Sequence, residues 1–122
     1  MSHIVEIQTE IRDPAAVAAA CQRLGLPEPV HGTAKLFEGE ATGWLVKLPG
    51  WLYPIVIDTS AAKIRFDNFG GSWGADEQLD HFLQAYGVAM ATIEARKKGL
   101  SVAEQTLADG SILVTIGVGG AL

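Results

Sequence analysis

Hydrophobic and polar residues alternate along residues 3–11, with apolar or threonine side chains at every second position. This period of two predicts a strand with one buried face. Asp13 and Pro14 predict the start of a helix, because aspartate caps a first turn and proline fits the first helical position. Gly25 predicts its end. The apolar face of this helix consists of Val17, Ala20, Cys21 and Leu24.

The middle of the chain is rich in strand-forming residues. Segments 43–46 and 55–57 are apolar on both faces, which is typical of central strands, whereas 63–67 alternates and should show one face to water. We predict four strands here, at 34–37, 42–48, 52–58 and 63–67.

A long helix is predicted over 76–98, ended by Gly99. A hairpin then pairs 101–107 with 111–118 across Asp109-Gly110, a strong turn signal. The order is therefore β-α-β-β-β-β-α-β-β. Residues 1–122 are expected to form a single α+β domain, in which two helices pack on one face of a mostly antiparallel sheet of about six strands.

The long helix breaks the usual amphipathic pattern. One stripe is apolar at helical spacing, but no residue from Phe82 to Ile93 is charged, so the opposite face lacks the expected solvated side chains. Such a helix is covered either by another element of its own chain or by a partner. The predicted core stripe is Leu79, Phe82, Leu83, Tyr86, Met90 and Ile93, and the back consists of Ala85, Val88, Thr92 and Ala95.

The last strand shows a similar lapse. We expect Ile112, Val114, Ile116 and Val118 to form its core face, opposite Ala103 and Leu107, with Glu104 and Thr106 on the other face beside Leu113. Contiguous apolar surface of this kind often marks an interface. The sequence therefore predicts a homo-oligomer interface made of Ala85, Val88, Ala89, Thr92, Leu113 and Thr115.

Charge and composition narrow the function classes. The net charge is −5 and the only basic cluster is 96–98, at a helix end, so the basic stripe that nucleic-acid binding needs is missing. A single cysteine suits a reducing compartment. The first residues do not resemble a signal peptide, and no apolar run is long enough to cross a membrane. We expect a cytoplasmic protein that binds neither nucleic acid nor membrane.

No catalytic, cofactor or metal site is predicted, which favours a non-enzymatic domain. His3, His31 and His81 lack the spacing of metal ligands. Cys21 lies on an apolar helix face, where a buried thiol is the usual interpretation.

The glycine-rich segment 68–74 allows two interpretations. A turn before a helix can bind phosphate, but this one lacks lysine and is followed by two acids. We favour a tight turn anchored to the core by Phe69 and Trp73. The aromatic residues nearby also allow a different function, a small-molecule binder or weak enzyme with a pocket formed by Trp51, Tyr53, Phe69 and Trp73.

Both ends of the chain resemble a family of unassigned function, the hypothetical chloroplast reading frame thirty-five proteins of cyanobacteria, plastids and other bacteria. The matching motifs are Met1-Ser2-His3, Ile7-x-Thr9-x-Ile11-Arg12-Asp13, Val102-x-Glu104-Gln105 and Ala108-Asp109-Gly110-Ser111-Ile112. The resemblance carries no catalytic residues.

The family's genes often lie beside one for an AAA-type ATPase, so the resemblance implies a third function, an adaptor for such an ATPase. This chain has Ala89, Met90 and Leu113 where relatives tend to be charged. Loss of charge in one region is compatible with a natural self-associating protein or with an engineered variant designed for assembly.

Overall fold

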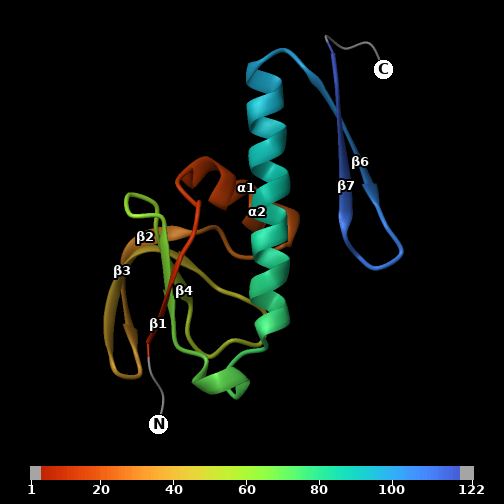
Figure 1. Cartoon of the computed structure of the whole chain (residues 1–122). Coiled ribbons are helices and arrows are strands. Elements are labelled where there is room, and N and C mark those ends of the chain that lie inside the picture. The colour runs from red at the N-terminus through yellow and green to blue at the C-terminus, as the bar shows by residue number, and fades with distance from the viewer. Residues whose placement is uncertain (1–3, 119–122) are drawn as a thin grey trace.

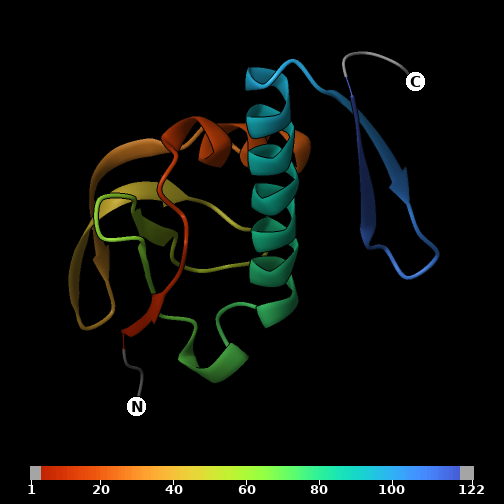
Figure 2. The ribbon, with the colours of Figure 1, turned by 45° about the horizontal axis from the view of Figure 1, so that its top comes forward.

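The computed structural model describes residues 4–118, which form three layers. A five-stranded sheet lies on one side, α2 (Asp76–Lys97) crosses the middle, and a hairpin lies on the far side of α2 (Figures 1 and 2). The shorter α1 (Pro14–Arg23) packs against α2. The α+β class and the order β-α-β-β-β-β-α-β-β are confirmed.

The main sheet is antiparallel throughout, in the order β1-β5-β4-β3-β2. Segment 55–57 was predicted to be central because it is apolar on both faces, and this is confirmed, since β4 occupies the middle of the sheet. Residue 3 of the first predicted strand lies outside the described part of the chain. The strands are β1 (Val5–Gln8), β2 (Val30–Leu36), β3 (Gly39–Val46), β4 (Ile55–Asp58) and β5 (Lys63–Phe66).

The start of α1 follows the predicted capping. Asp13 is extended, and its carboxylate accepts a hydrogen bond from the amide of Ala15 at 2.9 Å. Pro14 occupies the first helical position. Leu24 was expected on the buried face, but it is the C-cap residue and is exposed. The buried face of α1 is instead Ala16, Val17, Ala20 and Cys21.

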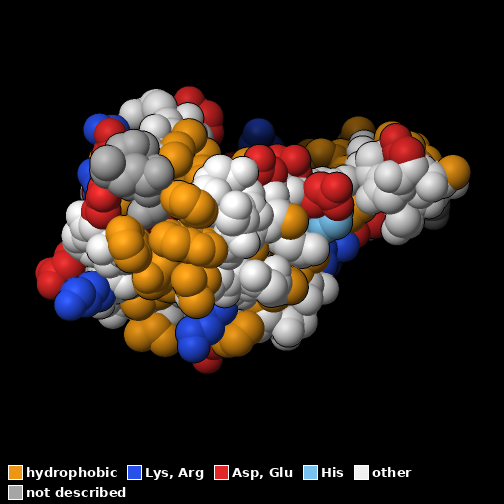
Figure 3. Space-filling view, turned by 90° about the horizontal axis from the view of Figure 1, so that it is seen from below, with side chains coloured by type: hydrophobic (Ala, Val, Ile, Leu, Met, Phe, Trp, Pro, Cys, Tyr) orange, Lys and Arg blue, Asp and Glu red, His pale blue; other side chains and the backbone are white. Residues whose placement is uncertain are grey.

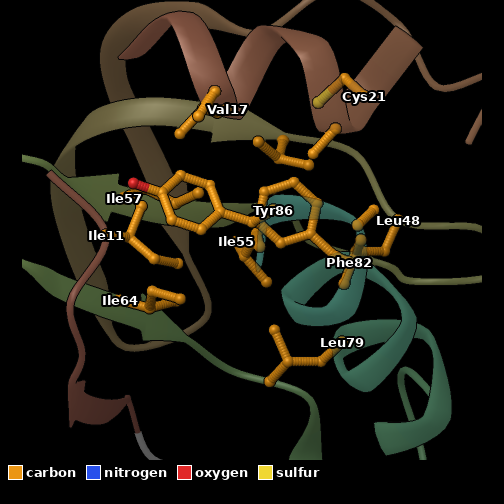
Figure 4. Close-up of a cluster of buried hydrophobic side chains, with 14 of the residues drawn as sticks. Ile11, Val17, Cys21, Leu48, Ile55, Ile57, Ile64, Leu79, Phe82 and Tyr86 are labelled. Carbon is orange, nitrogen blue, oxygen red and sulfur yellow. The ribbon is translucent and has the colours of Figure 1, made fainter. Parts of the chain in front are cut away.

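The main core lies between the helices and the sheet. Figure 4 shows Val17 and Cys21 of α1 and Phe82 of α2 meeting the isoleucines of β4. Tyr86 adds a polar tie, since its hydroxyl accepts hydrogen bonds from the backbone amides of residues 12 and 13, both at 3.2 Å. Leu79, Phe82 and Tyr86 are buried as predicted, and Leu83, Met90 and Ile93 are half-buried against the same cluster.

The other face of the sheet carries a smaller cluster. Ile55 and Ile57 point into the main core, and Val56 between them belongs to the second cluster. Burial on both faces explains why β4 has no polar residue before Asp58. The second cluster consists of Ala34, Leu36, Ala41 and Val56, flanked by Ile4, Leu45 and Tyr53.

The C-terminal hairpin is a separate two-stranded sheet of β6 (Ser101–Thr106) and β7 (Ile112–Gly117). It contacts α2 through both strands. The main sheet therefore has five strands rather than about six, and the sixth and seventh strands lie on the opposite side of the long helix (Figure 1).

Candidate interaction surfaces

The back of α2 is covered within the chain. Ala85 and Ala89 belong to the main core, beside α1, and Val88 is only 6% exposed. Thr92 is half-buried, and its hydroxyl oxygen is buried without a partner. These four residues were predicted to need a second subunit, and that expectation is corrected, because α1 and the hairpin already flank this face. Of the two alternatives, the structure supports burial by the chain itself.

The hairpin adopts a register that differs from the prediction by one residue. The amide of Leu107 donates to the carbonyl of Ser111 at 2.8 Å, so the connection has three residues, with Gly110 at a φ of +88°. A two-residue turn at Asp109-Gly110 would pair Leu107 with Ile112, whereas Ile112 pairs with Thr106. A one-residue slip moves a strand's side chains to the other face.

The two faces of the hairpin are therefore composed differently from the prediction. Glu104 pairs with Val114 and lies on the face turned toward the helices, where its carboxylate binds Arg23 of α1 at 2.6 and 2.7 Å. This bidentate ion pair ties the hairpin to the body, which we define as residues 4–97. The outer face carries no charge and consists of Ser101, Ala103, Gln105, Leu113, Thr115 and Gly117.

The hairpin has no buried core. No residue from 101 to 118, all of which are described, reaches the buried class, although the segment is rich in branched apolar side chains. The predicted interface residues Leu113 and Thr115 are exposed, Leu113 at 48%. Ile116 and Val118, predicted to face the core, are 48% and 79% exposed, and Leu107 near the turn is also exposed.

A second apolar surface lies at the opposite end of the body. Seen from below, hydrophobic side chains gather there in one patch (Figure 3). Among the aromatic residues of the body, Trp73 stacks on Phe69 with ring centroids 4.7 Å apart, and it contacts Phe37 and Tyr53 with ring centroids 5.3 and 5.8 Å away. We call Phe37, Tyr53, Phe69 and Trp73 the aromatic patch. The sequence analysis missed Phe37, which belongs to the β2–β3 turn and is 58% exposed.

Trp51 has a structural role that the other predicted pocket residues do not share. Its ring packs edge-on to Phe66 with centroids 5.5 Å apart, and its indole nitrogen donates to the carbonyl of Ala75 at 3.0 Å. A Cβ placed on Gly74 would lie 2.4 Å from the Trp51 ring. Trp51 thus fastens the start of α2 to the sheet. The other three residues, Tyr53, Phe69 and Trp73, meet at the surface.

The glycine-rich loop is anchored by polar residues rather than by aromatic ones. Asn68 is buried and donates to the carbonyl of Gly74 at 3.1 Å and to the carboxylate of Asp76 at 2.8 Å. Asp67 is 1% exposed, and one of its carboxylate oxygens has no hydrogen-bond partner. The expectation that Phe69 and Trp73 anchor the loop to the core is therefore wrong, since Phe69 is exposed and Trp73 half-buried.

Phe69 adopts a strained backbone conformation. Its φ is +48°, in the left-handed region that costs a residue with a Cβ about 1–2 kcal/mol. Gly70 and Gly71 also have positive φ, at +61° and +102°. Asp67 accepts a hydrogen bond from the Phe69 amide at 3.2 Å and holds this conformation. In this backbone conformation, the Phe69 ring stacks on Trp73 at the surface.

Four hollows of the described surface lie away from the aromatic patch. One runs along α1, and two others lie between the helices and the hairpin, one beside Ile112 and the other beside Glu104. A fourth is bordered by the prolines at 27 and 54. None of the predicted pocket residues lines any of these four hollows, so the pocket remains a prediction.

The described residues bring together no group of three potential metal ligands. His31 lies edge-on to Trp44, with ring centroids 5.1 Å apart. Cys21 is 1% exposed, and burial raises the pKa of its thiol. This confirms the interpretation of Cys21 as a buried apolar side chain, because the reactive thiolate is disfavoured.

Comparison with known proteins finds no matching family model, curated protein or solved structure. The family resemblance and the ATPase partner that it implies remain predictions. No helix within residues 4–118 is long and apolar enough to span a membrane.

Proposed function

We propose that this protein is a self-associating binding domain and that a second copy covers its C-terminal hairpin. The observation that carries the proposal is the exposure of the hairpin. Its apolar residues alternate as in a core strand, yet none of residues 101–118 is buried. The interface proposed is thus the hairpin alone, with Leu113 and Thr115 retained and the back of α2 left out.

Energetics favour an additional cover for the hairpin. An isolated two-stranded ribbon is marginally stable at best, and this one has α2 against one face only. Leu113, Ile116 and Val118 are large apolar side chains, each of which gains about 1.5–3 kcal/mol when fully buried. A partner strand beside β7 shields part of Leu113 on the outer face and part of Ile116 on the opposite face, and it thereby stabilises both the assembly and the hairpin itself.

The chemistry of the surface favours a second copy as that partner. The outer face of the hairpin is uncharged, so two hairpins that join side by side bring no like charges together on this face, although the chain carries a net charge of −5. Two-fold dimers, in which one patch meets its own copy, are the commonest oligomers. An acidic or basic partner would find no complementary charge on this face.

The solution mass tests the proposal. Light scattering at micromolar concentration should give at least twice the mass of the chain. Leu113→Lys, which places a charge on the outer face, should reduce the mass to that of one chain with an unchanged circular dichroism spectrum. The matched control is Leu52→Lys, at an exposed leucine of the body, which should leave the mass unchanged. A monomeric wild-type protein would contradict the proposal.

The aromatic patch supports a second candidate function, binding of a small molecule with a flat apolar ring. Its support is the strained Phe69, whose ring is held against Trp73 at the surface. Aromatic faces of this kind offer offset or edge-to-face contacts to a ligand ring.

Titration with indoleacetamide as a non-ionic probe should show saturable binding in a ligand-detected NMR experiment. Trp73→Ala should abolish this saturation, while Trp44→Phe should retain it. Absence of saturation would argue against this function.

A further inference from the structure

We infer that the second copy joins through the outer edge of β7, so that two hairpins form one continuous four-stranded antiparallel sheet. The inference rests on the proposed self-association and specifies its geometry: a two-fold axis perpendicular to the sheet, passing at Val114. Three observations carry it, namely the direction of the free backbone groups, the distribution of charge over the two edges, and the residues that the axis brings together.

The direction of the free backbone groups follows from the register. The pair Leu107 and Ser111 is hydrogen-bonded, and bonded and non-bonded pairs alternate along an antiparallel ladder. Residues 113, 115 and 117 of β7 therefore direct their amide and carbonyl groups to β6. Ile112, Val114 and Ile116 direct theirs to the outer edge. Within the described chain no other strand pairs with this edge, so it presents three donors and three acceptors.

Charge distinguishes the β7 edge from the β6 edge. β6 carries Glu104 in its middle, and a two-fold contact there would bring two carboxylates together while each is held by its own Arg23. No residue from 110 to 118 is charged. Proteins commonly protect exposed edges with charged residues, prolines or bulges, and β7 has none of these. The β7 edge is therefore the one open to pairing.

The position of the axis follows from the three outward residues. An axis at Val114 pairs Val114 with itself and Ile112 with Ile116 of the partner subunit, so all three outward residues form hydrogen-bonded pairs within the strand. On the outer face it places Leu113 opposite Thr115 of the partner subunit. This last pair is of the non-hydrogen-bonded type, with Cα atoms about 4.5 Å apart, within the range of a disulfide.

The first test removes one outward amide. Val114→Pro deletes the donor at the axis in both copies while sparing the bonds to β6, since proline is tolerated where the N–H of an edge strand points away from the sheet. Two intermolecular hydrogen bonds are lost together, so the dimer dissociation constant should rise about tenfold or more. Val114→Ala controls for the side chain, and Thr106→Pro removes an outward amide of β6; both should retain the wild-type mass. Loss of assembly in Thr106→Pro but not in Val114→Pro would overturn the inference.

The second test uses cross-linking. A mixture of Leu113→Cys and Thr115→Cys proteins should form a disulfide-linked dimer under mild oxidation, while each variant alone should form little. Cys21 contributes little background because it is buried. A dimer of normal mass without this cross-link would overturn the inference and leave the proposed function standing. A wild-type monomer would instead refute the proposed function itself.

Discussion

The body and the hairpin each contain a strand rich in apolar residues, but the strand of the body is buried and that of the hairpin is not. In β4, Ile55, Val56 and Ile57 are at most 1% exposed, because strands lie on both sides and clusters cover both faces. In β7, an equally apolar strand, no residue is buried. Apolar sequence thus makes a core only where the topology supplies neighbours on every side, and within residues 4–118 β7 has one neighbouring strand and one helix against it.

The largest expected effect is a difference in the stability lost when a large side chain is truncated in the body and in the hairpin. Phe82→Ala should lower the free energy of unfolding by about 3–5 kcal/mol, because it leaves a cavity in the main core. Leu113→Ala should lower it by about 0.5 kcal/mol or less when measured on dilute monomer, since half of that side chain is already in water. Urea unfolding followed by circular dichroism gives both values. Equal losses would mean that the hairpin contributes to the same core as the body.

A smaller effect is expected at Gly74, which leaves no room for a Cβ beside the Trp51 ring. Gly74→Ala should destabilise by about 1–3 kcal/mol, because its Cβ would overlap the Trp51 ring. The matched control is Gly87→Ala on α2, where nothing lies within 4 Å of the added Cβ. That change should stabilise by about 0.5–1 kcal/mol through helix propensity. Thermal unfolding of the two variants should shift in opposite directions, and a stable Gly74→Ala protein would contradict the packing described here.

The ion pair that joins the hairpin to the body should contribute less to stability than either of these packing effects. The Arg23–Glu104 pair is bidentate, but about a third of each side chain is exposed, so water screens it. A double-mutant cycle with alanine at both positions should give a coupling of about 0.5–1 kcal/mol. Amide exchange in β6 and β7 should accelerate in Glu104→Ala while exchange in β4 does not change. Accelerated exchange in both regions would show that the hairpin does not open separately.

The smallest expected effect is the pH dependence of the hairpin turn. Hydrogen bonds from the hydroxyl and amide of Ser111 lower the pKa of Asp109 at the hairpin turn. A lowered pKa means that the charged form favours the folded turn, so this contribution is complete above the ordinary aspartate pKa of 3.8 and is lost as pH falls through the lowered value. The amide resonance of Ser111 should titrate below pH 3.8 in the wild type and should not show this titration in Asp109→Asn. A transition at or above 3.8 would contradict this.

Local signals predicted most of the elements. Asp13 and Pro14 marked the start of α1, and the two-sided apolar pattern of 55–57 identified the central strand. The same reasoning failed at the hairpin, because Asp109-Gly110 fits both a two-residue turn and a three-residue connection closed by Leu107 and Ser111. That choice of one residue decided which face carries Glu104.

The candidate surfaces were less predictable than the fold. Tyr53, Phe69 and Trp73 were identified from composition, but Phe37 was not, since it comes from a turn far away in the chain. The bulk of Phe69 and Trp73 suggested core anchors, whereas Asp67 and Asn68 are the buried residues of that loop. The positive φ of Phe69 has no signal of its own in the residue pattern.

The sequence by itself determined the class, the element order and the uncharged stretch from Phe82 to Ile93 in the long helix, because these depend on the residue types, their periodicity and local capping. Only the tertiary structure decided what covers the apolar surfaces. Residues such as Val88 and Leu113 have similar polarity, and one is buried while the other is exposed. The reason is that burial depends on which elements meet in space, and α2 lies between two layers whereas the outer face of the hairpin meets none in the described chain.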